Sequence, residues 1–294
     1  MGADALPSNG GLQVAVVVDS AASLPADMAR DSGLHVVPMG LTVDGTSYLD
    51  GRDLSPTEFY RLLTESPTLP STSAPSPARF LEAFRQAAET APSILCLTVS
   101  SNFSATFDSA KTAAAEAGES LPDVEIRVLD TGSAAGGEGL IALEACRSAN
   151  RGAGLDEVAS AVESVITGVR LMAFVDTLYY LWKGGRVSKI AHAGTSLLKI
   201  KPLFELSQGQ VRTLARPRTH RRAMNRLVEL MRQRAAAGRL HATIMHADSA
   251  GPAEELRAQI AAEFDYEELF VSEFTPVMGV HIGPGLLGIA YWNG

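Results

Sequence analysis

The chain has 294 residues, of which 46% are hydrophobic and 20% are charged, the balance of a soluble globular protein with one large or two ordinary domains. Its net charge of −8 argues against a general affinity for nucleic acid, and no apolar run approaches the roughly 18 residues that a membrane-spanning helix needs. Both cysteines lie in apolar runs and are expected to be reduced core residues, which indicates a cytoplasmic protein.

Apolar runs alternate with helical patterns over the first half of the chain. We predict strands at 14–18, 35–43, 94–99 and 124–129, and helices at 26–31, 56–63, 107–117, 140–149, 155–166 and from residue 77 onward. This alternation indicates βαβ units and a mostly parallel sheet. Loops after the carboxyl ends of parallel strands share one edge, so Asp19-Ser20, residues 100–104 and Asp130-Thr131 are expected to converge there.

The second half of the chain mixes antiparallel and parallel features. We predict strands at 170–175, 201–206, 211–217, 242–246, 269–273 and 289–292, and helices at 221–236 and 253–264. The predicted fold class is therefore α/β with two domains. A mostly parallel sheet flanked by helices occupies residues 13–168, a smaller α+β-like domain occupies 169–294, and residues 1–12 are an irregular tail.

Three consecutive hydroxyl residues, Ser71, Thr72 and Ser73, stand between prolines ahead of a helix that begins at Ser76-Pro77. This pattern predicts a stiff loop that leads into a helix N-terminus, where free N–H groups favour an anion. A carboxylate that docks there would lose little to the ordering of the loop. A polar turn with an ordinary N-cap is the alternative.

A second group of hydroxyls follows the strand at 94–99 and includes Ser101 and Ser104, for which helix capping is the alternative. His281 lies in the glycine-rich segment 279–285, which is predicted to be a turn. A histidine there could donate to a carboxylate or move a proton, although a structural role is the alternative. The other five histidines show no zinc-like spacing, so no metal is assigned.

Residues 183–226 hold eleven basic residues and a single acid, Glu205, in a chain that is acidic overall. This face could bind phosphate, nucleic acid or an acidic partner protein, and a solvated surface is the alternative. The chain contains no G-x-G-x-x-G, no P-loop and no G-x-S-x-G motif. Nucleotide binding and α/β-hydrolase chemistry therefore lack their usual signatures.

The chain also carries seven short segments in a fixed order: D-S-A-A-S-L-P at 19–25, P-S-T-S-A-P-S-P at 70–77, S-S-N-F-S-A-T-F-D-S-A at 100–110, D-T-G-S-A-A-G-G-E-G at 130–139, K-G-G-R-V at 183–187, K-P-L at 201–203 and H-I-G-P-G-L-L-G at 281–288. Each is weak alone. Together they resemble the DegV family of bacterial fatty-acid-binding proteins from about residue 14 to residue 292.

The resemblance implies a two-domain α/β protein that holds a long-chain fatty acid in a tunnel between its domains. It implies that hydroxyls of the P-[ST]-T-S and S-x-x-S segments bind the carboxylate, which gives this role to Thr72 and Ser104. Ser71, Ser101 and His281 are expected to be neighbours of the head group. The resemblance implies no cofactor beyond the bound lipid.

Members of the family act as the acyl-carrier subunit of a fatty acid kinase, in which a separate ATP-binding subunit phosphorylates the carboxylate for phospholipid synthesis. The resemblance therefore implies a carrier without a complete active site, and Arg186 would help to dock or align the kinase. Ala74, Ala105 and Phe107 stand where glutamine, glycine and tyrosine are common in the family. The change at Ala105 affects how closely the backbone can approach the head group, and Phe107 lacks the hydroxyl of tyrosine. None of the three departures removes the expected carboxylate ligands.

Two other functions remain open from the residues. A stand-alone serine hydrolase that acts on a lipid ester would use Ser104 or Ser20 with His281. A nucleic-acid-binding or lipid-responsive regulatory protein would use the arginine-rich face. The carrier is the leading interpretation because the hydrolase lacks its nucleophile elbow and the overall acidity opposes nucleic acid binding.

Overall fold

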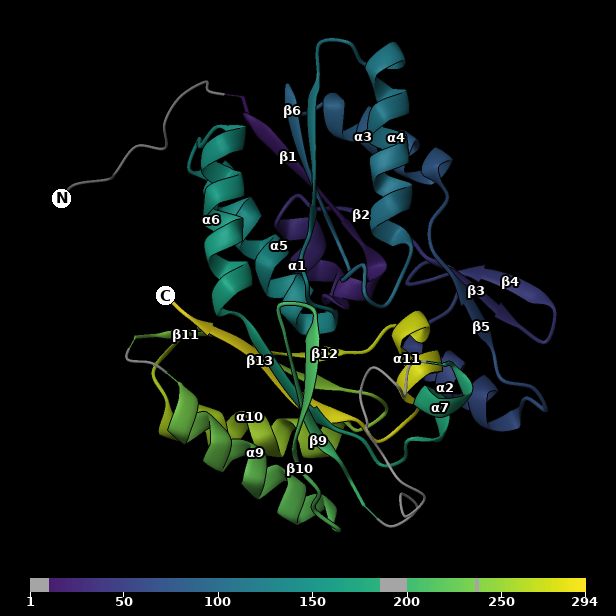
Figure 1. The fold of residues 1–294 in the computed structure, drawn as a ribbon, viewed down its shortest axis with the longest axis vertical. Helices are drawn as coiled ribbons and strands as arrows, with labels where there is room; N and C mark the ends of the chain where they lie inside the picture. Colours follow the sequence, from purple (N-terminus) through teal and green to yellow (C-terminus); the bar gives the residue numbers. More distant parts are fainter. Residues whose placement is uncertain (1–10, 186–199, 236–237) are drawn as a thin grey trace.

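Three sheets organise the protein, and the computed structural model describes residues 11–185, 200–235 and 238–294 (Figure 1). The first sheet is entirely parallel and has the order β2-β1-β6-β7. Its strands are Val14–Asp19 (β1), His35–Val37 (β2), Ser93–Thr98 (β6) and Glu125–Asp130 (β7). The expectation of a mostly parallel sheet in the first half of the chain is thus confirmed.

The second sheet is mixed and has the order β10-β9-β8-β13-β11-β12, in which β11 and β12 are parallel and the other neighbours are antiparallel. Its strands are Arg170–Phe174 (β8), Leu203–Ser207 (β9), Gln210–Ala215 (β10), Leu240–His246 (β11), Tyr266–Glu273 (β12) and Leu287–Asn293 (β13). The α/β fold with one parallel and one mixed sheet agrees with the predicted class. The proposed limits of the two domains stay a prediction.

Helices cover the sheets in layers. The helices are Ala26–Asp31 (α1), Pro56–Glu65 (α2), Pro77–Ala88 (α3), Thr106–Ser120 (α4), Ala135–Asn150 (α5), Leu155–Gly168 (α6), Tyr179–Lys183 (α7), His220–Arg234 (α9), Ala250–Glu263 (α10) and Pro276–Ile282 (α11), with a 3-10 turn at Ser20–Ala22 (η1). Apolar faces of α3 and α4 pack on one side of the parallel sheet, and those of α5 and α6 pack on the other. The outer face of the mixed sheet is covered by α9 and α10 (Figure 1).

A small third sheet, which was not predicted, has the order β4-β3-β5 and projects to one side beside α2 and α11 (Figure 1). It consists of Gly40–Val43 (β3), Thr46–Leu49 (β4) and Ser71–Ser73 (β5). The single strand expected at 35–43 is wrong, because the chain leaves the parallel sheet at Pro38 and enters this sheet at Gly40. Proline lacks the N–H that a continuous ladder needs.

Two segments expected to be irregular are regular. The hydroxyl stretch is strand β5, antiparallel to β3 with Leu41 opposite Thr72, and not a free loop. Residues 135–139, which lie before the helix predicted at 140–149, are already helical, because α5 begins at Ala135. Tertiary packing decides both cases, since each segment lies against a neighbouring element that local sequence does not reveal.

Helix α5 lies between the parallel sheet and the mixed sheet, and nearly all of its residues are buried. Its glycines allow this close approach on both sides. A Cβ on Gly136 would come within 2.3 Å of Thr243 Cγ2 on β11, and one on Gly139 within 3.0 Å of the Ala22 carbonyl oxygen. The helix therefore serves as a common inner layer for the two large sheets.

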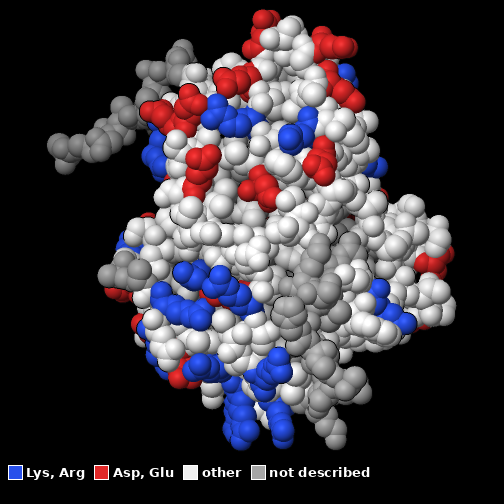
Figure 2. Space-filling view, viewed as in Figure 1, with Lys and Arg blue, Asp and Glu red and all other residues white. Residues whose placement is uncertain are grey.

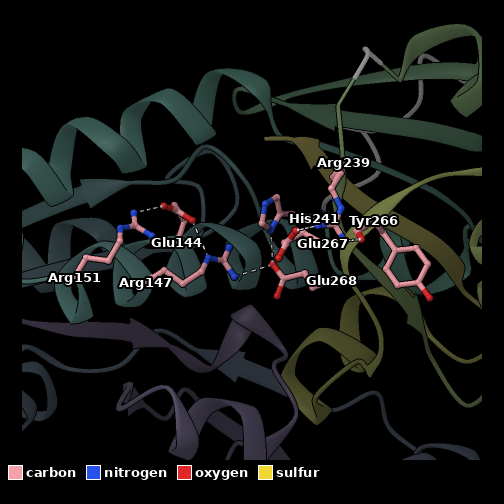
Figure 3. A network of polar contacts seen from close by, with 8 residues as sticks. All are labelled: Glu144, Arg147, Arg151, Arg239, His241, Tyr266, Glu267 and Glu268. Atoms are coloured by element: carbon pink, nitrogen blue, oxygen red, sulfur yellow. Dashed lines mark hydrogen bonds and ion pairs between the residues drawn. The ribbon is translucent and has the colours of Figure 1, made fainter. Parts of the chain in front are cut away.

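A polar network fastens the end of α5 to the mixed sheet (Figure 3). Arg147 donates from Nε to Glu144 Oε2 at 2.8 Å and from Nη1 to Glu268 Oε1 on β12 at 2.9 Å. The same Glu268 oxygen lies 2.9 Å from His241 Nδ1 on β11, and the His241 ring stacks on Trp292. The charges are partly buried, so water weakens these contacts less than it would weaken surface pairs.

Candidate functional site

A cavity of about 550 Å³ lies among the three sheets, within the size range of small-molecule sites. Five of its lining residues are polar or charged, and the others are apolar. The polar ones are Thr72, Ser101, Ser104, Asp108 and His281. The apolar ones are Ala21, Met39, Ala74, Val99, Phe103, Ala105, Ala134, Ala135, Leu171, Leu181, Phe204, Leu206, Val211, Phe274, Val277, Met278, Ile282 and Leu286.

Thr72 and His281 meet in this cavity although they are 209 residues apart in the chain. Thr72 Oγ1 on β5 lies 2.9 Å from His281 Nε2 on α11, and both side chains are half-buried. Alternation along β5 directs Thr72 inward and leaves Ser71 and Ser73 exposed. Ser71, expected to be a neighbour of the head group, therefore lies outside the cavity lining.

Helix α11 corrects the expected environment of His281. The histidine is in the last turn of a helix that begins at Pro276, and the chain turns only at Gly283, whose φ is +72°. The sequence signal for a turn was right about the glycines after His281 and wrong about the histidine itself. The helix carries the His281 ring to Thr72.

The loop between β6 and α4 supplies Ser101 and Ser104 to the same cavity. Ser101 donates from its backbone N at 3.1 Å and from its hydroxyl at 2.5 Å to Asp130 Oδ2, at the end of β7. The Ser104 hydroxyl lies 2.7 Å from Thr106 Oγ1. Asp108 lies in the first turn of α4, four residues after Ser104, and is exposed at the cavity rim. Its place at the start of the helix predicted to follow Ser104 was the signal that would have found Asp108.

The predicted convergence of strand ends at one edge of the parallel sheet is confirmed. Asp19 Oδ1 accepts a hydrogen bond from Ala21 N at 2.9 Å, and Oδ2 accepts one from Val99 N at 2.8 Å. Thr131 donates to the Thr98 carbonyl oxygen at 2.8 Å. Since Ala21 and Val99 line the cavity, the Asp19 carboxylate holds two segments of its wall together.

Asp19 and Glu138 form a buried acidic pair behind that wall. Both side chains are fully buried. Burial raises the pKa of Asp19 to about 6, against the lowering effect of the hydrogen bonds from Val99 and Ala21. Burial, and then the negative charge of Asp19, raises the pKa of Glu138 well above its ordinary value. The pair therefore takes up a proton at higher pH than two exposed carboxyl groups would.

The hydroxyl segments are joined to each other close to the cavity. Ser109 on α4 donates to the carbonyl oxygen of Pro75, just behind β5, at 2.5 Å. Ser20, one candidate nucleophile for a hydrolase, donates to Asp50 Oδ2 at 2.6 Å and is buried. In the part of the chain that the structure describes, no group of three or more His, Cys, Asp or Glu residues could hold a metal ion.

An arginine-rich surface lies on β10, the loop that follows it and the start of α9. Arg212, Arg216, Arg218, Arg221 and Arg222 are exposed, and none of them pairs with an acid among the described residues. Figure 2 shows basic side chains gathered over the lower half of this face, whereas acidic side chains dominate its upper end. Arg186, the expected docking residue, lies outside the described residues. None of the described helices is long and apolar enough to cross a membrane.

The family model described as "Uncharacterised protein, DegV family" matches residues 13–293. The chain belongs to the DegV family. A DegV domain-containing protein of Streptomyces coelicolor is 35% identical over 281 residues, which cover 94% of this chain and 97% of that one. The resemblance of the seven sequence segments is thus confirmed over nearly the whole chain.

Solved DegV structures have the same fold. A fatty-acid-binding DegV family protein from Thermus thermophilus superposes with a TM-score of 0.88 at 30% identity, over 96% of this chain and 100% of that one. DegV of Bacillus subtilis, described as a fatty acid binding protein, superposes with a TM-score of 0.86 at 26% identity, over the same shares of the two chains.

Proposed function

We propose that this chain binds a long-chain fatty acid in the cavity and presents its carboxylate to a separate ATP-binding kinase subunit. The observation that carries the proposal is a cavity with a largely apolar lining into which Thr72, Ser104 and His281 bring hydrogen-bonding groups. The fatty acid binding of its relatives from Thermus thermophilus and Bacillus subtilis supports this ligand class.

The apolar lining would supply most of the affinity. Each buried methylene contributes roughly 0.8 kcal/mol, so a tail of about fourteen methylenes contributes on the order of 11 kcal/mol before losses from ordering. Leu171, Phe204 and Leu206 on the mixed sheet and Val277 on α11 would contact the tail. Binding would then bury the tail between the mixed sheet and α11.

The polar lining would fix the head group. The hydroxyls of Thr72 and Ser104 and an N–H of His281 can donate to a carboxylate without a permanent positive charge. Such a neutral cluster satisfies the buried anion and leaves its oxygen reactive, whereas an arginine clamp would hold it more firmly as an anion. Ser101, which is exposed and held by Asp130, would lie at the rim of the site.

The kinase subunit would supply ATP and the phosphorylation chemistry. Exposure of Ser101, Ala105 and Asp108 in the cavity lining leaves an access route to the head group. The unpaired arginines of β10 and α9 offer a surface for an acidic face of the partner, together with the proposed role of Arg186. The chain itself would carry the acyl group and perform no reaction alone.

Binding and phosphorylation are tested with one set of variants. Palmitic acid affinity and acyl phosphate formation, trapped with hydroxylamine in the presence of the kinase subunit and ATP, are measured for the intact protein and for Thr72→Val with Ser104→Ala. Loss of two hydrogen bonds to a charged group is expected to weaken binding at least roughly tenfold and to abolish phosphorylation.

Ser73→Ala is the matched control, because this hydroxyl belongs to the same strand and lies outside the lining. It should leave both measurements unchanged. Unchanged phosphorylation in the double variant would contradict the assignment of the head-group site. Mass spectrometry of lipid extracted from the denatured protein would identify the acyl chain, and a protein that neither carries nor binds fatty acid would contradict the ligand class.

A further inference from the structure

Helix α11 has an unusual cap at its first turn. Its N-cap residue, Thr275, makes no side-chain capping hydrogen bond, although N–H groups at a buried helix start need acceptors. The acceptor comes from Asp50, which is 227 residues away in the chain and is 3% exposed. The helix matters for the cavity because it contributes four lining residues: Val277, Met278, His281 and Ile282.

The carboxylate of Asp50 joins three segments. Its Oδ1 accepts a hydrogen bond from Val277 N at 2.9 Å, and its Oδ2 accepts one from Ser20 Oγ at 2.6 Å. Ser20 Oγ in turn accepts one from Met39 N at 3.1 Å. Burial raises the pKa of Asp50, and the hydrogen bonds from Ser20 and Val277 offset part of this effect. One carboxylate thus ties α11 to the end of β1 and to the start of β3.

The rest of α11 is held by the same small unit of residues 39–73. In its middle, a Cβ on Gly279 would come within 2.5 Å of Phe59 Cε1 on α2, so the two helices touch closely. In its last turn, His281 meets Thr72 on β5. Figure 1 shows α11 beside α2 and the small sheet. The position of the first turn of α11 therefore determines where the His281 side chain lies relative to the Thr72 hydroxyl.

We propose that Asp50 is a positioning residue that sets helix α11, and through it His281, against Thr72 at the polar end of the cavity. This inference rests on the proposed fatty acid site for its consequence in binding. Removal of the carboxylate leaves the Val277 N–H and the Ser20 hydroxyl without their acceptor. The helix then shifts to find other partners, and the pairing of His281 with Thr72 is lost, whereas the apolar wall on the mixed sheet (Leu171, Phe204 and Leu206) stays in place.

Two ligands with hydrocarbon tails of equal length distinguish a positioning role of Asp50 from general damage to the cavity. Palmitic acid and hexadecanol are compared on Asp50→Ala and on the control Asp53→Ala, whose exposed carboxylate accepts a hydrogen bond from Leu49 N at the end of β4. Asp50→Ala is expected to bind palmitic acid roughly tenfold more weakly. Its affinity for hexadecanol should stay within about twofold, and Asp53→Ala should change neither. Equal losses for both ligands, or no loss for either, would overturn the proposal.

The conservative variant Asp50→Asn tests the contact itself. Asparagine keeps an oxygen that can accept from Val277 N, so most of the palmitic acid affinity should return; a loss as large as that of Asp50→Ala would refute the proposed contact. Urea unfolding shows whether each variant is folded. Where Asp50→Ala is not, Asp50→Leu, which also removes the acceptor but fills the buried space, takes its place in the ligand comparison with the same expected result. In a His281→Ala background, Asp50→Ala should add little further loss, and a fully additive loss would refute action through His281.

A spectroscopic measurement needs no ligand. In imidazole ¹⁵N spectra of the free protein, Asp50→Ala should shift the His281 resonances and leave those of His35, on β2, unchanged. Asp53→Ala should shift neither. If the intact protein binds no palmitic acid, the proposed function fails, and the His281 spectra still decide the role of Asp50. Unchanged His281 resonances would overturn it.

Discussion

Replacing Glu138 by glutamine should stabilise the protein at neutral pH. Glu138 is completely buried on α5, and burial together with the charge of Asp19 raises its pKa well above the ordinary value of 4.5. The folded protein therefore keeps a proton that the unfolded chain releases. Glutamine has nearly the same shape and is neutral at every pH, so the variant folds without this proton uptake.

The size of the effect follows from linkage. Because the folded state binds more protons, the free energy of unfolding falls as the pH rises above 4.5 and continues to fall up to the folded-state pKa. Each pH unit inside this window costs at most about 1.4 kcal/mol. Asp19, whose pKa is raised to about 6 chiefly by its own burial, is present in both proteins.

Urea unfolding of the intact protein and Glu138→Gln at pH 5, 6 and 7 measures this difference. We expect the advantage of the variant to grow from pH 5 to pH 6, by up to about 1.4 kcal/mol. Glu116→Gln, an exposed carboxyl on α4, is the control and should show no such trend. A difference that does not change with pH, or a variant less stable at pH 7, would refute the reasoning.

Two further substitutions probe the cavity and its wall. Leu206→Trp should fill space in the cavity, exclude about two methylenes of the ligand and so weaken fatty acid binding roughly tenfold. The control Leu69→Trp, at a residue outside the lining, should leave the affinity unchanged. Equal affinities of the two variants in a displacement assay would contradict this prediction. Gly279→Ala should destabilise the protein by about 1–3 kcal/mol, because the added methyl group would clash with Phe59. The control Gly118→Ala, which has open space around it, should not destabilise the protein. Equal thermal midpoints of the two variants would argue against tight packing at Gly279.

Local pattern was enough to predict most of the elements. The β-branched run at 14–18 and the apolar run at 94–99 are central strands of the parallel sheet. Because both faces of these strands are buried, their residues are apolar almost throughout, which is typical of a buried parallel strand. The Ser55-Pro56 start of α2 is also confirmed, with a capping box to Glu58. Parallel topology also predicts that the strand ends share one edge, which the hydrogen bonds of Asp19 and Thr131 confirm.

Long-range pairing set the limit of the prediction. Nothing in the Ser71–Ser73 stretch itself reveals that β3 lies beside it, so its sequence predicts a loop where the structure has a strand. Asp50 was missed for the same reason, since its helix partner Val277 is distant in the chain and no spacing rule connects them. The meeting of Thr72 with His281 entered through family resemblance, because hydroxyl and histidine patterns alone fit capping and structural roles equally well.

The shared inner layer formed by α5 has a consequence for how the molecule melts. If α5 detaches, each large sheet loses the helix that packs on one of its faces. If either sheet unfolds first, α5 loses its contacts on that side. An intermediate with a single intact half would therefore expose apolar surface on both remaining parts. Although the chain builds two large sheets, it should come apart in one cooperative step.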